Sequence, residues 1–393
     1  MKKVVLLSFS LILGLVLSQL IPNITNPEFF ESSKSITNFL LFTCLSFIMI
    51  NVGREFELDK TKIKSYATDY GVAMASAAIP WIFVAIYFML LLPPEYLGNW
   101  DAWKENLLLS RFSAPTSAGI LFTMLLAVGL KNSWIYKKIQ ILAIFDDLDT
   151  ILLMIPLQIM MIGVKLPLLL IVIIITILLW YGWKFLNKFS IPQTWRAITT
   201  YSIIIVLLSN FTYWGTTKLF GAGNGIHLEV LLPAFVLGMS IKSVHYTSKI
   251  EVRYTNIISY VFMLLVGLVT PQFIGVDTLT ASLNAKTITA TFVEMEWSTI
   301  AFHVLMVTLL SNIGKMLPIF FYKDRALKER VALSIGMFAR GEVGAGIIVL
   351  SIGYSLGGYI LTIAMLSLVL NLVLTGFFIM YVKKLAYQVY NKE

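Results

Sequence analysis

The chain has 393 residues, of which 58% are hydrophobic and 13% are charged, and its formal net charge is +9. Soluble globular domains carry roughly 25% charged residues, so this composition excludes that class. The single cysteine, Cys44, excludes an intrachain disulfide and a cysteine-based metal cluster.

The apolar residues form stretches separated by charged or Gly/Pro/Asn-rich segments. A hydrocarbon core about 30 Å thick is crossed by roughly 20 residues of helix, and the stretches have that length. They lack the alternation of barrel strands, so we predict helices. The predicted spans are 4–22, 35–53, 66–92, 106–130, 139–163, 166–186, 197–217, 226–241, 254–275, 297–322, 331–353 and 357–382.

The distribution of basic residues gives the orientation. Twelve spans place both termini on one side, with 22 of the 30 Lys and Arg residues, and leave only five on the other side. Those five are Lys34, Lys104, Lys165, Lys218 and Lys286. Because basic residues stay in the cytoplasm, we predict a cell-membrane (inner-membrane) protein with both termini inside. Anionic lipid accounts for the net charge, and no nucleic-acid partner is needed.

Few charged residues fall inside the spans, where each costs about 2.5–3.5 kcal/mol on insertion scales. Asp69 and Glu229 lie near span ends and are expected at the interface. Arg111 lies five residues into the fourth span, and we expect its long side chain to extend to the interface as well.

The fourth span is interrupted at its middle by the run Ser113–Gly119. Pro115 has no backbone N–H, and its ring clashes with the preceding helical turn. The hydroxyl groups of Thr116 and Ser117, together with carbonyls freed by the break, are ligands that suit a hard cation such as Na+.

The fifth span contains three carboxylates. Asp146 and Asp147 lie eight and nine residues past Lys138, about 12 Å along the helix axis, which is too deep for a short side chain to reach water. Adjacent residues point about 100° apart, so one carboxylate can face a cavity and the other a neighbouring helix. Asp149 lies one turn from Asp146; it can attract a different cation, change a neighbour's proton affinity, or face a cytoplasmic funnel.

The tenth span supplies a buried cation at the same depth. Lys315 lies eight residues before Lys323, at the cytoplasmic end of that span. A buried cation and a buried carboxylate at equal depth favour pairing, so we predict an ion pair between Lys315 and Asp146. A structural pair without titration remains the alternative.

The eleventh span is interrupted like the fourth, by three glycines in the run Arg340–Gly346. Interrupted helices at membrane depth line protein or a watery cavity. Spans 3–5 and 10–12 start on opposite sides, which predicts inverted repeats with crossed discontinuous helices 4 and 11 and an ion site between them. Arg340 and Glu342 are expected to balance the partial charges of the half-helix ends.

These motifs resemble those of bacterial Na+/H+ antiporters of the cation/proton antiporter superfamily, over essentially the whole chain. Asp146-Asp147 resembles the Asp-Asp motif of the electrogenic branch, and Lys315 the basic residue that pairs with its first aspartate. Pro115-Thr116-Ser117 falls at the family's unwound span 4, and the run 340–344 resembles its span 11 signature.

The resemblance implies a core of spans 3–5 and 10–12, at about 66–163 and 297–382, that moves against a dimerisation domain made of the remaining spans. It implies a homodimer without a cofactor that exchanges Na+ (or Li+ or K+) for H+ by alternating access. Asp147 would bind the cation and exchange protons, and Asp146 and Thr116 would complete the site.

Two other classes are weighed against antiport. A Na+-coupled symporter of an organic anion can use the same fold, but is expected to place polar residues rather than an Asp pair at the crossing. An enzyme is not predicted, because the chain has no long hydrophilic loop of catalytic composition.

Overall fold

The computed structural model describes residues 2–24, 27–55, 63–162, 166–186, 188–220, 230–242, 249–269, 295–354 and 356–390. Within these ranges the ordered elements are helices, and the only β-type pairing is an isolated bridge between Phe189 and Ile241. The all-α class predicted from the sequence is therefore confirmed for the described part of the chain.

Six of the described helical segments are long and apolar enough to cross a membrane, and they are Ser35–Arg54, Ser65–Leu91, Trp195–Leu219, Lys249–Val269, Trp297–Phe320 and Gly358–Val389. Their outward faces carry large apolar side chains, such as Leu90 and Phe211, each of which is 67% exposed. Large apolar faces of this kind are favourable in contact with the hydrocarbon of a membrane and unfavourable in contact with water. The chain is a multi-pass membrane protein, and the total of twelve spans stays a prediction.

The chain divides into two compact units. The first comprises Met1–Asn26, Lys62–Met161 and Val266–Glu393, and the second comprises Pro27–Thr61 and Ile162–Leu265. These two units are defined by contacts within one structure. The division predicted from the sequence, into a moving core and a dimerisation domain, is a statement about motion. That division therefore stays a prediction.

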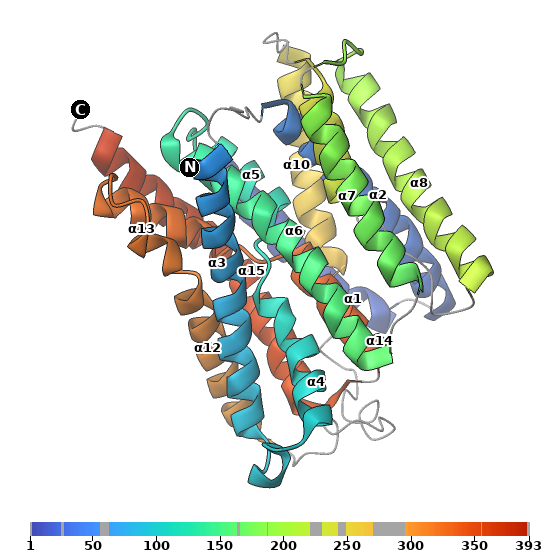
Figure 1. Cartoon of the computed structure of the whole chain (residues 1–393), viewed down its shortest axis with the longest axis vertical. Coiled ribbons are helices and arrows are strands. Elements are labelled where there is room, and N and C mark those ends of the chain that lie inside the picture. Colours follow the sequence, from blue (N-terminus) through green and yellow to red (C-terminus); the bar gives the residue numbers. More distant parts are fainter. Residues whose placement is uncertain are drawn as a thin grey trace. The chain divides into compact units, whose positions relative to one another are not determined.

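The first unit holds every candidate site residue. Its helices are α1 (Lys2–Ile24), α3 (Ile63–Leu91), η2 (Pro94–Tyr96), α4 (Trp100–Ser110), η3 (Arg111–Ser113), α5 (Ala118–Ala127), α6 (Trp134–Ile162), α12 (Trp297–Gly314), η5 (Leu317–Phe320), α13 (Leu327–Gly336), α14 (Glu342–Gly353) and α15 (Gly358–Tyr390). Helix α12 packs against both α3 and α15, and α13 also packs against α15, as can be followed in Figure 1.

Helices α3 and α12 approach most closely where a glycine meets a proline. A Cβ atom added to Gly314, the last residue of α12, would lie 2.6 Å from the backbone nitrogen of Pro80 and 2.7 Å from its Cα. Only a residue without a side chain fits there, because the atoms opposite belong to backbone that cannot rotate away. This contact sets the position of the residue that follows, Lys315.

Helices α12 and α15 are joined by two buried polar contacts. The hydroxyl groups of Thr308 and Ser367 lie 2.9 Å apart, and the Asn312 amide donates to the Asn371 side-chain oxygen at 3.0 Å. The second contact lies one helical turn after the first on both α12 and α15. These contacts satisfy polar groups inside the unit, where no water competes, and hold the end of α12 beside α15.

The second unit contains α2 (Pro27–Glu55), α7 (Leu166–Lys184), α8 (Trp195–Phe220), α9 (Leu231–Ser240) and α10 (Lys249–Val269), the last of which crosses the unit boundary. Helix α9 packs against α2, α7 and α8. At the crossing of α2 and α9, Gly53 and Gly238 each lie against the other helix's backbone, leaving no room for a Cβ atom.

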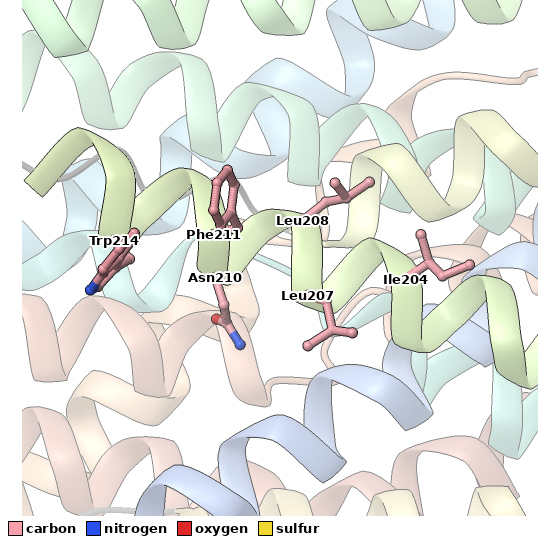
Figure 2. Close-up of a pocket in the computed structure, with 6 residues that line it drawn as sticks. All are labelled: Ile204, Leu207, Leu208, Asn210, Phe211 and Trp214. Carbon is pink, nitrogen blue, oxygen red and sulfur yellow. The ribbon is translucent and has the colours of Figure 1, made fainter.

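A shallow depression lies along the outer face of α8 in this unit (Figure 2). It is lined by Ile204, Leu207, Leu208, Asn210, Phe211 and Trp214. None of these six side chains is ionisable, so the depression offers no group that exchanges a proton.

Candidate functional site

The chain between α4 and α5 leaves the helical path, as the sequence predicts for the fourth span. Helix α4 ends at Ser110, the short turn η3 follows, and the backbone is extended at Ser117 before α5 begins. Ser117 caps α5 by accepting a hydrogen bond from the backbone N–H of Ile120 at 3.3 Å. Pro115 lies inside this break, where its missing N–H costs no helical hydrogen bond.

A second break separates α13 from α14, within the predicted eleventh span. Helix α13 ends at Gly336 and α14 begins at Glu342. The two breaks lie against each other: the Ser117 N–H donates to the Ala339 carbonyl at 2.9 Å, and the Thr116 hydroxyl donates to the Met337 carbonyl at 3.0 Å. Backbone groups that the breaks release are thus satisfied by each other, as membrane depth requires.

Arg340 completes this junction. The residue is 1% exposed, and its guanidinium donates to the carbonyls of Pro115 (3.4 Å), Met337 (3.3 Å) and Ser311 (3.4 Å). A cation surrounded by carbonyl oxygens stabilises the negative ends of the interrupted segments. Glu342 begins α14, but its side chain lies outside the described residues.

Asp146 of α6 is held from two other elements. Lys315 Nζ lies 2.9 Å from Asp146 Oδ2 and 3.1 Å from Oδ1, and the Thr116 N–H donates to Oδ2 at 2.7 Å. The side chains of Asp146 and Lys315 are both fully buried. The predicted ion pair is therefore present, and it joins α6 and the end of α12 to the break before α5.

The predicted span 297–322 placed Lys315 inside a continuous helix, and this prediction is wrong. Helix α12 ends at Gly314, Lys315 is its C-cap, and η5 follows from Leu317. Pro318 explains the interruption, because its ring cannot continue a regular helix. Lys315 therefore lies at the C-terminal end of α12, where the partial negative charge of the helix dipole stabilises its ammonium group.

Asp147 is 3% exposed and follows Asp146 on α6. Successive helical residues point about 100° apart, so its carboxylate is directed away from that of Asp146. Thr116 is fully buried and Ser117 is 1% exposed, and both lie in the break that contacts Asp146. The predicted ligand groups of the site thus come from α6 and from the break between α4 and α5.

Asp149 lies beside a second buried cation. Arg111 Nη2 donates to the Asp149 carbonyl at 3.2 Å and lies 3.8 Å from Asp149 Oδ2. The guanidinium carbon is also 4.8 Å from the centre of the Trp81 ring. The expectation that Arg111 extends to the interface is wrong: its side chain is fully buried, because the helix stops at Ser110 and η3 turns Arg111 inward.

Asp69, expected at the interface, is 1% exposed although it lies in the second turn of α3. Lys138 Nζ lies 2.9 and 3.0 Å from its two carboxylate oxygens, and the Tyr322 hydroxyl donates to it at 2.7 Å. Sequence reasoning missed these partners. The equal-depth argument used for Lys315 would have found Lys138, since both Asp69 and Lys138 lie near cytoplasmic span ends. Glu229 lies outside the described residues.

One sequence pattern typical of hydrolases does occur. The run Gly353–Gly357 has the spacing Gly-x-Ser-x-Gly, with Ser355 outside the described residues. A catalytic serine of this kind needs a preceding strand, whereas this run follows helix α14. The pattern therefore indicates no hydrolase site.

Comparison with solved structures finds a transporter of the same architecture. The sodium proton antiporter MjNhaP1 from Methanocaldococcus jannaschii aligns over 95% of this chain and 91% of its own, with a TM-score of 0.56 and 14% identity. At this identity the likeness shows the fold. No protein-family model matches the chain, and no curated protein does.

Proposed function

We propose that the protein is a secondary active transporter that exchanges Na+, or Li+ or K+, for H+ across the cell membrane. One observation carries the proposal: two adjacent buried carboxylates, one of them paired with a buried lysine, lie where two interrupted helices meet. Buried ionised groups are costly in a membrane protein and are retained for ion or proton movement.

The site combines the groups that such exchange needs. Asp147 supplies a carboxylate that binds either a proton or a hard cation, and Asp146, Thr116 and Ser117 supply further oxygen atoms. Lys315 holds Asp146 when no cation is bound, because each charge would be costly alone. Competition between protons and a cation for the same carboxylates couples the two fluxes in opposite directions.

The likeness in fold supports alternating access. In this proposal the twelve spans form inverted repeats, the interrupted helices cross, and the site opens to each side in turn. A core of spans 3–5 and 10–12 would move against the remaining spans in a homodimer. Both termini would lie in the cytoplasm, where the excess of basic residues would meet anionic lipid.

The surroundings of the buried cations weigh against the symporter of an organic anion. An anion-binding site needs an available positive group, whereas Lys315 is engaged with Asp146 and Arg340 with three carbonyls. The third buried cation, Arg111, lies beside the carboxylate of Asp149, which would repel an anion. Uptake of an anion driven by Na+, with no change of lumenal pH, would favour the symporter instead.

Proteoliposomes containing the purified protein provide the test. Imposed gradients of Na+, Li+ and K+, applied in turn, should drive proton movement that a lumenal pH dye records. Asp147→Asn should abolish this signal with the protein still folded, because the amide cannot exchange a proton. Asp101→Asn is the control, since Asp101 is 68% exposed on α4. Wild-type-like exchange by Asp147→Asn would refute the assignment.

A further inference from the structure

The buried layer of α6 contains a second cation–carboxylate pair that the proposed exchange does not use. Arg111 contacts Asp149 through both the carbonyl and the carboxylate, and its guanidinium lies over Trp81. Its Nε and Nη1 atoms have no hydrogen-bond acceptor among the described residues. The positive charge of Arg111 is therefore balanced chiefly by Asp149.

Among the side chains that the structure describes, the charges of this layer balance one another. Three carboxylates of α6, at positions 146, 147 and 149, lie in one turn of helix, and three cations, Lys315, Arg340 and Arg111, are buried near them. Asp149 follows Asp146 by three residues, so the two carboxylates lie on the same side of α6. An unbalanced charge at position 149 would act directly on the proposed exchange site, because little solvent screens it.

We propose that Arg111 and Asp149 are a positioning pair that sets the pH range of exchange. Arg111 neutralises Asp149, so that this third carboxylate neither binds the transported cation nor carries a transported proton. The inference rests on the proposed function, and it assigns to Asp149 and Arg111 a role that differs from ligand binding.

Other ionisable groups surround the pair. Asp146 interacts electrostatically with both Arg111 and Asp149, Lys315 interacts with both as well, and Tyr70 of α3 interacts with Asp149. Arg340 acts on Lys315 and Asp146. All of these residues are kept when position 111 or 149 alone is substituted, so a shift of the pH profile reports the charge removed from the pair.

The test measures the rate of cation-driven proton movement against pH for Arg111→Gln, Asp149→Asn and the double variant. Arg111→Gln leaves a negative charge that strengthens proton binding at Asp146 and Asp147, so the profile should move to higher pH. Asp149→Asn leaves a positive charge and should move the profile to lower pH. Each shift should be about half to one pH unit, and the double variant should return towards the wild type.

Two further variants separate charge from structure. Arg111→Lys keeps the positive charge and should keep the wild-type profile even where it lowers the maximal rate. Lys104→Gln removes a charge from the Lys104–Asp101 pair on α4, the helix that precedes Arg111, and should leave the profile unchanged. Failure to observe opposite shifts in Arg111→Gln and Asp149→Asn overturns the proposal. Should Arg111→Gln not fold, Asp149→Asn decides alone: a shift to higher pH, or none, overturns it.

Thermal unfolding in detergent gives a readout that does not depend on transport. Each single substitution should lower the melting temperature, and the double variant should lose less than the sum of the two, because it removes both charges. Additive losses would overturn the pair. A wild-type protein that shows coupling in this cycle but no cation–proton exchange would instead refute the proposed function.

Discussion

Asp146 is the residue at which the site is most tightly constrained, since it accepts hydrogen bonds from Lys315 and from the backbone of Thr116. Both oxygens of the carboxylate are used, one of them twice. The residue is therefore a junction between α6, the end of α12 and the break before α5. Asp147, one position later, is the group proposed to exchange ions.

Lys315→Ala should lower the free energy of unfolding by about 3–5 kcal/mol, because it leaves the carboxylate of Asp146 buried without its cation. Thermal unfolding in detergent measures the loss, with Lys323→Ala, an exposed lysine nearby, as the control. Asp146→Ala in the Lys315→Ala background should cost much less than it does alone. Strict additivity of the two substitutions would show that they do not act on each other.

Depth along the helices was enough to predict the pair between Asp146 and Lys315 from the sequence. Depth failed for Arg111, because it assumes a continuous helix, and the turn η3 redirects the side chain to Asp149. Depth along the helix predicts the position of a side chain on a regular helix, but not within one turn of a break.

The two helix breaks are the elements that assemble the site. Both breaks were foreseen from composition, since Pro115 cannot continue α4 and glycines follow Arg340. The second break was placed too late, however, because it covers residues 337–341, whereas Gly344 and Gly346 lie within α14. The hydrogen bonds between the two breaks were not foreseen, because single-sequence patterns do not report which backbone groups meet. The end of α12 at Gly314 was missed although Pro318 indicates it, because the hydrophobic run continues beyond it.

Gly341→Ala should disrupt the contact between the breaks. A Cβ atom at this position would lie 2.7 Å from Ser117 Oγ and 2.8 Å from Ser117 Cβ, so the two segments would have to separate. We expect the free energy of unfolding to fall by about 1–3 kcal/mol, measured by thermal unfolding. The transport rate in proteoliposomes should fall as well.

Gly346→Ala is the matched control on the same segment. It lies within α14, and no atom comes within 4 Å of a Cβ placed there. Alanine in a helix interior is more favourable than glycine by about 0.5–1 kcal/mol, so this variant should be as stable as the wild type or more so. Equal behaviour of the two alanine variants would contradict the close approach at Gly341.

At the scale of the whole molecule, the all-helical membrane architecture followed from composition and from the asymmetry of basic residues. The likeness to the sodium proton antiporter MjNhaP1, at 14% identity, agrees with the predicted all-helical membrane fold. The division into two compact units depends on contacts between distant segments, and composition along the chain does not determine those contacts.

Charge movement is the molecular property that follows from two adjacent carboxylates and one lysine. Two protons can be released for each Na+ bound, provided that the Asp146–Lys315 pair breaks or Lys315 itself gives up a proton. Exchange would then move one net charge per cycle, which a membrane potential drives with about 2.3 kcal/mol per 100 mV. We expect this electrogenic ratio rather than one-for-one exchange. The Na+ gradient that just cancels a set pH gradient should therefore change when the liposomes are clamped at a defined potential instead of zero.

A balance point that stays the same at both potentials would mean electrically silent exchange, with the Asp146–Lys315 pair acting as a permanent lock. Asp149→Asn should leave the balance point unchanged, since Asp149 is not proposed to carry a proton.

The contact between Gly314 and Pro80 has a consequence for how this sequence can diverge. Gly314 has no side chain that could bind an ion. Any side chain at this position would nevertheless collide with the backbone of α3 and move Lys315 away from Asp146. Selection for exchange should purge substitutions of this glycine as strictly as substitutions of the carboxylates. In lineages that lose the glycine, residue 80 should change with it, so that the two positions covary although neither touches an ion.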